Sequence, residues 1–124
     1  MVPVMSEIFP TYERHGNVTC VVLGREFKSV DEFLLDQIRD DILEKAYSAD
    51  PPYVLIDLSE VKFFGSSFIE VLFRIWNKVG KGENGKFGIS GLTKYCVEVL
   101  EVTQLDKLWD LYPTLDDAVA KMNS

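Results

Sequence analysis

The sequence predicts a single α/β domain: a small mixed β-sheet of about four strands with helices packed mainly on one face. First, short apolar or β-branched runs alternate with longer segments of helical periodicity. Second, two strand-like runs flank a turn at residues 15–17 and indicate an N-terminal hairpin, whereas the later strands are separated by helices. Third, a length of 124 residues fits one domain, residues 1–124.

Four segments have the composition of strands. Residues 12–14 form the first arm of the predicted hairpin, and residues 18–23 (VTCVVL) form the second. Residues 53–56 (YVLI) are a short apolar run, which suits a strand that is covered on at least one face. Residues 86–90 (KFGIS) are predicted to form a weaker strand.

Helix starts are predicted from residues that cap free backbone N–H groups. Ser29–Glu32 and Ser67–Glu70 each place a hydroxyl at the N-cap and a carboxylate three residues later. Two more helices are expected over residues 95–102 and 114–122, the last capped by Thr114. The apolar positions that helical spacing directs to the core are Phe33, Leu34, Leu35, Ile38, Ile42, Leu43 and Ala46 in the first helix and Phe68, Leu72, Ile75, Trp76 and Val79 in the second.

The overall charge and the cysteine content narrow the classes of function. The net charge of −7 argues against binding to nucleic acid or to anionic membranes, because both favour a basic surface. The sequence shows no secretory leader and no apolar run long enough for membrane insertion, so we expect a cytoplasmic protein. Cys20 and Cys96 are then reduced core residues, and with His15 as the single histidine no metal site is expected.

Enzyme signatures are weak. The glycine-rich loop at residues 80–86 follows a helix and lacks the Ser or Thr of a phosphate-binding loop. A hydrolase would need to pair His15 with Ser66, and the G-x-S-x-G pattern of a nucleophile elbow is not met. The acidic stripe Asp36, Asp40 and Glu44 is typical of a solvated helix face. We therefore expect neither catalysis nor a cofactor.

The corner formed by Gly65, Ser66 and Ser67 has two interpretations. Ser67 is expected to be the N-cap of the following helix, with Ser66 a loop residue before it. The same corner suits a regulatory phosphate, because a helix start offers free N–H groups and a phosphoserine adds about −1.5 to −2 charges. The flanking Phe64 and Phe68 are either an exposed anchor for a partner or part of the core.

Several segments together resemble the STAS domain, in particular the bacterial anti-sigma-factor antagonists. The resemblance extends from about residue 13 to residue 118 and depends on segments that follow one another in the family's order. The matching segments are residues 54–61 (VLIDLSEV), 63–67 (FFGSS), 85–89 (GKFGI), 100–108 (LEVTQLDKL) and 112–118 (YPTLDDA). The resemblance implies the STAS fold and a regulatory binding protein without catalysis.

The resemblance also implies a site and a partner. Ser66 would be phosphorylated by a partner that is both a serine kinase and an anti-sigma factor, and phosphorylation would end binding. Ser67, Phe68 and Ile69 would then line the interface with that partner. Phe64, as an aromatic anchor, and Gly65, which allows close approach of a partner backbone, are also expected to contact it.

This chain departs from the family pattern at three positions. Gly65 stands where an acidic residue usually precedes the serine, and Phe68 stands where a glycine usually follows the serine pair. Phe27 replaces an Asp of the second strand. The alternatives are a STAS scaffold without a switch and a STAS domain that binds a small anion or a nucleotide. A homodimer formed through an edge strand near the N-terminus stays open.

Overall fold

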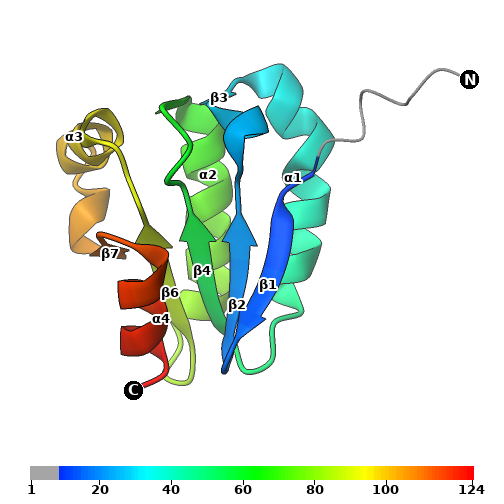
Figure 1. Cartoon of the computed structure of the whole chain (residues 1–124), viewed down its shortest axis with the longest axis vertical. Helices are drawn as coiled ribbons and strands as arrows, with labels where there is room; N and C mark the ends of the chain where they lie inside the picture. Colours follow the sequence, from blue (N-terminus) through cyan, green and yellow to red (C-terminus); the bar gives the residue numbers. More distant parts are fainter. Residues whose placement is uncertain (1–8) are drawn as a thin grey trace, which may run out of the picture.

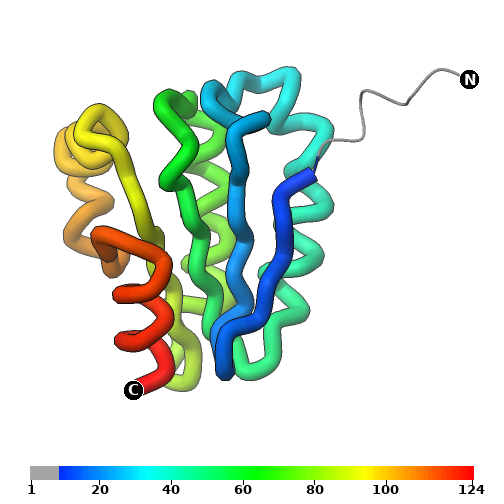
Figure 2. The backbone as a smooth tube through the Cα atoms, viewed as in Figure 1, coloured from blue at the N-terminus to red at the C-terminus, as the bar shows by residue number. Residues whose placement is uncertain are grey.

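The computed structural model describes residues 9–124, which form one five-stranded sheet, one small two-stranded sheet and the helices around them (Figures 1 and 2). The first eight residues, for which the sequence predicts no secretory leader, lie outside the described part. The main sheet contains, in spatial order, β1 (Thr11–His15), β2 (Val18–Val22), β4 (Tyr53–Asp57), β6 (Lys86–Ser90) and β7 (Asp110–Tyr112).

The connections decide the direction of each strand. β1 and β2 form the predicted antiparallel hairpin, in which His15 pairs with Val18 across the turn. The remaining neighbours are parallel, because a helical segment separates each strand from the next strand in the sheet. The central strand β4 is buried from Val54 to Asp57, as expected for a strand covered on both faces.

The sheet has one strand more than the roughly four predicted from the sequence. The additional strand is β7, whose three residues, Asp110 to Tyr112, are too few to show an alternating pattern. A separate small sheet forms where β3 (Ser29–Val30) pairs in parallel with β5 (Phe63–Phe64). Both strands have two residues, so neither could be predicted from periodicity.

Helices cover both faces of the main sheet unequally (Figure 1). α1 (Glu32–Tyr47) and α2 (Ser66–Ile75) lie side by side on one face, and α2 continues into a π-helical turn at Trp76–Gly80. α4 (Leu115–Met122) covers part of the other face. The prediction of helices mainly on one face is confirmed, and α4 is the exception. α3 (Lys94–Val102) lies on the β7 side of the molecule.

Two apolar clusters follow from this layering. The larger one fills the space between the sheet and α1 and α2, and the smaller one lies under α4. Fully buried side chains on the α1 and α2 side include Leu35, Ile38, Leu72 and Ile75, as predicted from helical spacing. The prediction that Phe33 is a core residue is wrong, because 69% of its side chain is exposed at the first turn of α1.

The start of α1 also differs from the prediction. Ser29 is not the N-cap, because its backbone belongs to the β3–β5 ladder. Asp31 caps α1 instead, with its Oδ1 accepting a hydrogen bond of 2.8 Å from the Leu34 N–H. The cap predicted at Thr114 is confirmed, since its hydroxyl accepts from the Asp117 N–H at 3.1 Å.

The glycine-rich loop that joins α2 to β6 is a packing feature. A Cβ on Gly85 would lie 1.5 Å from the carbonyl oxygen of Val79, and a Cβ on Gly80 would lie 2.3 Å from the Cβ of Phe87. Both positions therefore require glycine because the backbone approaches closely. Packing therefore accounts for Gly80 and Gly85, whereas the position of a Cβ on Gly82 is open.

Candidate functional site

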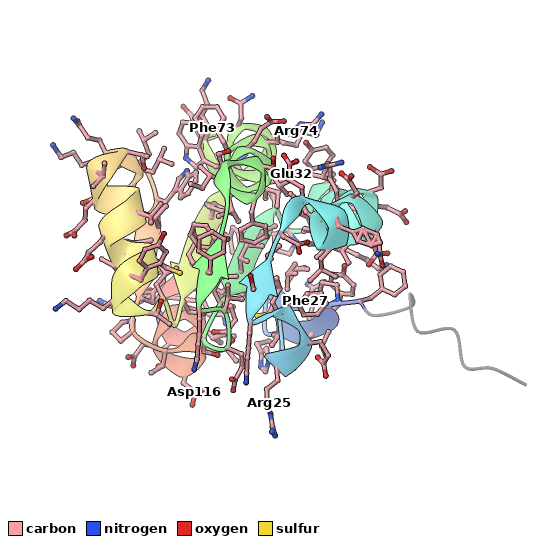
Figure 3. All side chains as sticks on the ribbon, turned by 90° about the horizontal axis from the view of Figure 1, so that it is seen from above. Arg25, Phe27, Glu32, Phe73, Arg74 and Asp116 are labelled. Carbon is pink, nitrogen blue, oxygen red and sulfur yellow. The ribbon has the colours of Figure 1, made fainter. Side chains whose placement is uncertain are left out.

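The first turns of α1 and α2 meet at the edge of the sheet to which β2 and β4 point. The β3–β5 ladder brings them together, because it pairs Ser29 with Phe63 and Val30 with Phe64 just before each helix begins. Figure 3 shows this end of the molecule from above, with Glu32 between α1 and α2 and Asp116 on the opposite side of the sheet. Segments about 35 residues apart in the sequence, such as Glu32 and Ser67, thereby share one surface.

Ser66 is the first residue of α2, and its side chain is exposed. The N-cap is Gly65, which has extended backbone angles and offers no side-chain hydrogen bond to the helix start. The Gly65 carbonyl accepts from the N–H groups of Phe68 and Ile69 at 3.1 and 3.3 Å. The Ser66 hydroxyl is therefore accessible at the positive end of the helix dipole.

Ser67 is not the N-cap that the sequence predicts. It is the second residue of α2, because β5 ends at Phe64 and Gly65 already takes the cap position. Its Oγ donates a hydrogen bond of 2.6 Å to Oε1 of Glu32. This bond connects the first turn of α2 to the first turn of α1.

Phe64 and Phe68 belong to the core. Their side chains are 3% and 1% exposed, and their ring centroids lie 5.4 Å apart. The expectation of an exposed aromatic anchor is therefore wrong for both, because β5 directs Phe64 inward and Phe68 lies on the buried face of α2. Gly65 and Ile69 are half-buried beside them.

The exposed aromatic residues of this surface were missed by the sequence analysis. Phe63 is 44% exposed, and its ring lies 6.0 Å from the ring of Tyr95 in the first turn of α3, which is 49% exposed. Adjacent strand residues point to opposite sides, so the Phe-Phe pair itself implied that one ring faces outward. Below Tyr95, a shallow hollow of about 310 Å³ opens on α3, lined by Val99 and Val102 among others.

A buried carboxylate, Asp57, lies at the end of β4. Asp57 is 5% exposed and accepts hydrogen bonds from the hydroxyls of Ser59 at 2.8 Å and Ser90 at 2.7 Å. These bonds satisfy a charge that would otherwise be unfavourable inside the protein. Phe27, which stands at the position of the family's Asp, lies outside β2 in the 3-10 turn Arg25–Phe27, where its apolar side chain is fully buried.

The structure does not bring the predicted hydrolase pair together. His15 lies at the β1–β2 turn, at the opposite end of the sheet from Ser66, and its Nε2 lies 2.7 Å from Glu13 Oε1. The thiols of Cys20 and Cys96 are buried; burial, followed by the charges of Glu13 and Asp57, raises the pKa of Cys20 to about 12. Such a thiol stays protonated and unreactive at neutral pH.

Within residues 9–124, no cluster of three His, Cys, Asp or Glu side chains is placed to hold a metal ion. The acidic stripe Asp36, Asp40 and Glu44 is exposed on α1, and Asp36 forms an ion pair of 2.8 Å with Arg39. None of the helices in the described part is long and apolar enough to cross a bilayer.

Comparison with known proteins places this geometry in a family. The model of the STAS domain matches residues 10–118. A curated relative, the anti-sigma-F factor antagonist RsfB of Mycobacterium tuberculosis, is 27% identical over 109 residues, which are 88% of this chain and 84% of that protein.

Solved structures agree with the family match. An anti-sigma-factor antagonist (STAS) domain protein from Planctomyces limnophilus superimposes with a TM-score of 0.85 and 37% identity, covering 92% of this chain and 97% of the other. SpoIIAA in its unphosphorylated form has a TM-score of 0.72 at 14% identity, covering 90% of this chain and 94% of the other, and shares the fold. Anti-sigma-factor antagonists of this family are regulatory binding proteins without enzymatic activity. The mixed sheet with its helices and the match over residues 10–118 make this chain a member of the STAS domain family.

Proposed function

We propose that this protein is an anti-sigma-factor antagonist that binds a kinase-type anti-sigma factor and is switched by phosphorylation of Ser66. The observation that carries the proposal is the exposed Ser66 hydroxyl at the first position of α2, with no capping role to occupy it. The name of RsfB supports the role, and SpoIIAA, a protein of the same fold, has been solved in unphosphorylated and phosphorylated forms. A role in transcription regulation in the cytoplasm is part of this proposal.

The docking surface surrounds Ser66. Phe63 and Tyr95 form its exposed aromatic part on the α3 side, and Phe33 extends it on the α1 side. Large aromatic side chains of this kind often anchor protein interfaces. The backbone at Gly65 leaves room for a partner, because no atom lies within 4 Å of the position that a Cβ would take. Phe64 and Phe68 hold this surface in place from below.

Phosphorylation changes the charge of the surface. The Ser66 Oγ forms a bond to the γ-phosphorus of a nucleoside triphosphate held by the partner, the bond from that phosphorus to the bridging oxygen breaks, and the hydroxyl proton passes to a base of the partner. The product carries about −1.5 to −2 additional charges. Two exposed carboxylates are nearby: Glu32 lies in the first turn of α1, and Glu70 lies one turn further along α2. The added charge therefore makes an acidic region more acidic and opposes the return of an apolar or acidic partner surface.

The test measures binding of purified kinase-type anti-sigma factors from the source organism by isothermal titration calorimetry. The variants are Ser66→Ala, Ser66→Glu and, as the matched control, Ser48→Glu, which adds the same charge at the exposed C-cap of α1. We expect wild type, Ser66→Ala and Ser48→Glu to bind alike, and Ser66→Glu to bind at least about tenfold more weakly, as expected for a close like-charge contact.

Two results would contradict the proposal. Equal affinity of wild type and Ser66→Glu would favour the STAS scaffold without a switch. Absence of binding to every kinase-type anti-sigma factor, together with a rise in melting temperature on adding phosphate or nucleotide, would favour the anion-binding alternative. That alternative receives no support from the site, because the Glu32 carboxylate accepts a hydrogen bond from Ser67 at this helix start.

A further inference from the structure

We infer that Glu32 determines which of the two adjacent serines is modified, by holding the Ser67 hydroxyl and leaving Ser66 free. The inference rests on the proposed function, because it assumes that Ser66 is the acceptor of the phosphoryl group. It assigns to a residue of α1 a specificity role for chemistry that takes place on α2. The juxtaposition exists only in the folded protein, since Glu32 and Ser67 are 35 residues apart.

The contact between Ser67 and Glu32 has a fixed direction. An ionised carboxylate only accepts hydrogen bonds, so the Ser67 hydroxyl must donate its proton to Oε1 across the 2.6 Å separation. Hydrogen bonds to a charged acceptor are shorter and stronger than those between neutral groups. The Ser67 side chain is half-buried, and its bond to the exposed Glu32 lies at the protein surface.

A phosphate on Ser67 would turn this attractive contact into a repulsive one. The proton that Ser67 donates would be replaced by a group with about −1.5 to −2 charges, held directly against the Glu32 carboxylate. The modified protein would lose one charge-assisted hydrogen bond and gain a like-charge contact. Ser67 is therefore a poor acceptor of a phosphoryl group while its hydroxyl is held by Glu32.

Ser66 has the opposite surroundings. Successive residues of an α-helix point about 100° apart, so the Ser66 side chain leaves the helix in a different direction from that of Ser67. It is exposed, whereas Ser67 is turned toward α1. A phosphate on Ser66 extends into solvent, where water screens its repulsion from Glu32 and Glu70. Glu32 thus selects Ser66 by making the adjacent Ser67 a poor acceptor of the phosphoryl group.

The test installs phosphoserine by genetic encoding at position 66 or at position 67, each in the wild-type and the Glu32→Gln background. The melting temperature of each full-length protein is compared with that of the same preparation after phosphatase treatment. We expect phosphoserine at position 67 to lower the melting temperature by about 4 °C or more, and Glu32→Gln to remove at least half of that loss. Phosphoserine at position 66 should produce a much smaller loss that Glu32→Gln leaves nearly unchanged.

The direction in which Glu32→Gln changes the melting temperature distinguishes selection between the two serines from simple structural support. In the unmodified protein the substitution replaces a hydrogen bond to a charged acceptor by a weaker bond to a neutral amide oxygen, and it should lower the melting temperature slightly. With phosphoserine at position 67 the same substitution should raise the melting temperature. Glu70→Gln is the matched control, because it removes the same charge from an exposed carboxylate one turn along α2. It should relieve clearly less of the loss at position 67 than Glu32→Gln does, because Glu70 is only a surface neighbour three residues along the helix, whereas Glu32 contacts Ser67 directly.

Equal losses at positions 66 and 67, or equal relief by Glu32→Gln and Glu70→Gln, would overturn the inference. These measurements need no partner protein, so they are independent of the calorimetric test of the proposed function. A protein that binds no anti-sigma factor but shows the reversal of sign would refute the proposed function and retain the electrostatic role of Glu32.

Discussion

Replacement of Phe68 by alanine distinguishes most directly between a core residue and an exposed partner anchor. The side chain is 1% exposed, lies on the buried face of α2 and packs against Phe64 at a centroid separation of 5.4 Å. Phe68→Ala should therefore leave a cavity directly beneath the first turn of α2. The variant is expected to lose stability before any direct effect on binding can be measured.

The magnitude follows from complete burial. Substitution of a buried Phe by Ala lowers the free energy of unfolding by about 3–5 kcal/mol, because the lost transfer energy adds to that of the remaining cavity. Domains of this size are typically stable by about 5–15 kcal/mol, so the change removes a large fraction of the total. Phe63→Ala is the matched control: its side chain is 44% exposed, and a partial loss of burial predicts about 1 kcal/mol.

The assay is urea unfolding followed by tryptophan fluorescence, for which the buried Trp109 is a suitable reporter. Phe68→Ala should lower the midpoint strongly, whereas Phe63→Ala should shift it little and weaken partner binding instead. A fall of less than about 1 kcal/mol in the free energy of unfolding of Phe68→Ala, with an unchanged slope against urea concentration, would contradict this expectation. The side chain would then not be part of the core, and the assignment of the buried face of α2 would be wrong.

Three further predictions concern buried or closely packed positions of the fold. Asp57→Asn should lower the free energy of unfolding by about 1–3 kcal/mol in the same urea assay, because an amide cannot accept both hydroxyl hydrogen bonds as the carboxylate does; an unchanged midpoint would contradict this. Gly85→Ala should destabilise by about 2 kcal/mol or more in thermal unfolding, since its Cβ would lie 1.5 Å from the Val79 carbonyl oxygen, and wild-type stability would show that the loop is not closely packed. Cys20 should react with a thiol reagent at pH 8 only after unfolding. Rapid labelling of the native protein would refute this assignment. Burial, followed by the charges of Glu13 and Asp57, raises the pKa of Cys20 from 9.0 to about 12, so the thiol ionises more easily in the unfolded chain than in the folded protein. The contribution of Cys20 to stability is therefore complete below pH 9 and is lost as the pH rises toward 12, and Cys20→Ala should flatten this alkaline decline.

Segments with strong local patterns were predicted well. The hairpin, the strand Lys86–Ser90 and the cap at Thr114 agree with the structure because alternation, turn residues and capping hydroxyls act within a few residues of one another. The motif order led to the STAS family, and the match over residues 10–118 confirmed it. For the same reason the position of Ser66 at the start of α2 was nearly correct from the sequence, which differed only in the capping residue.

The details of the site depended on contacts between distant segments. The β3–β5 ladder committed Ser29 to a strand and moved the N-cap of α1 to Asp31, and no local rule could anticipate a pairing across about 34 residues. The sequence also did not determine which of the two Phe residues of β5 faces outward. The fold buries Phe64 and leaves Phe63 exposed.

The sequence by itself determined the fold class, the family and the serine pair, because these depend on periodicity and on the order of short motifs along the chain. The sequence also favoured Ser66 as the free serine, with Ser67 as a helix cap, but only the tertiary structure decided what engages the Ser67 hydroxyl. Its partner is a glutamate from another helix, 2.6 Å away, and such a contact exists only when the β3–β5 ladder aligns the two helix starts.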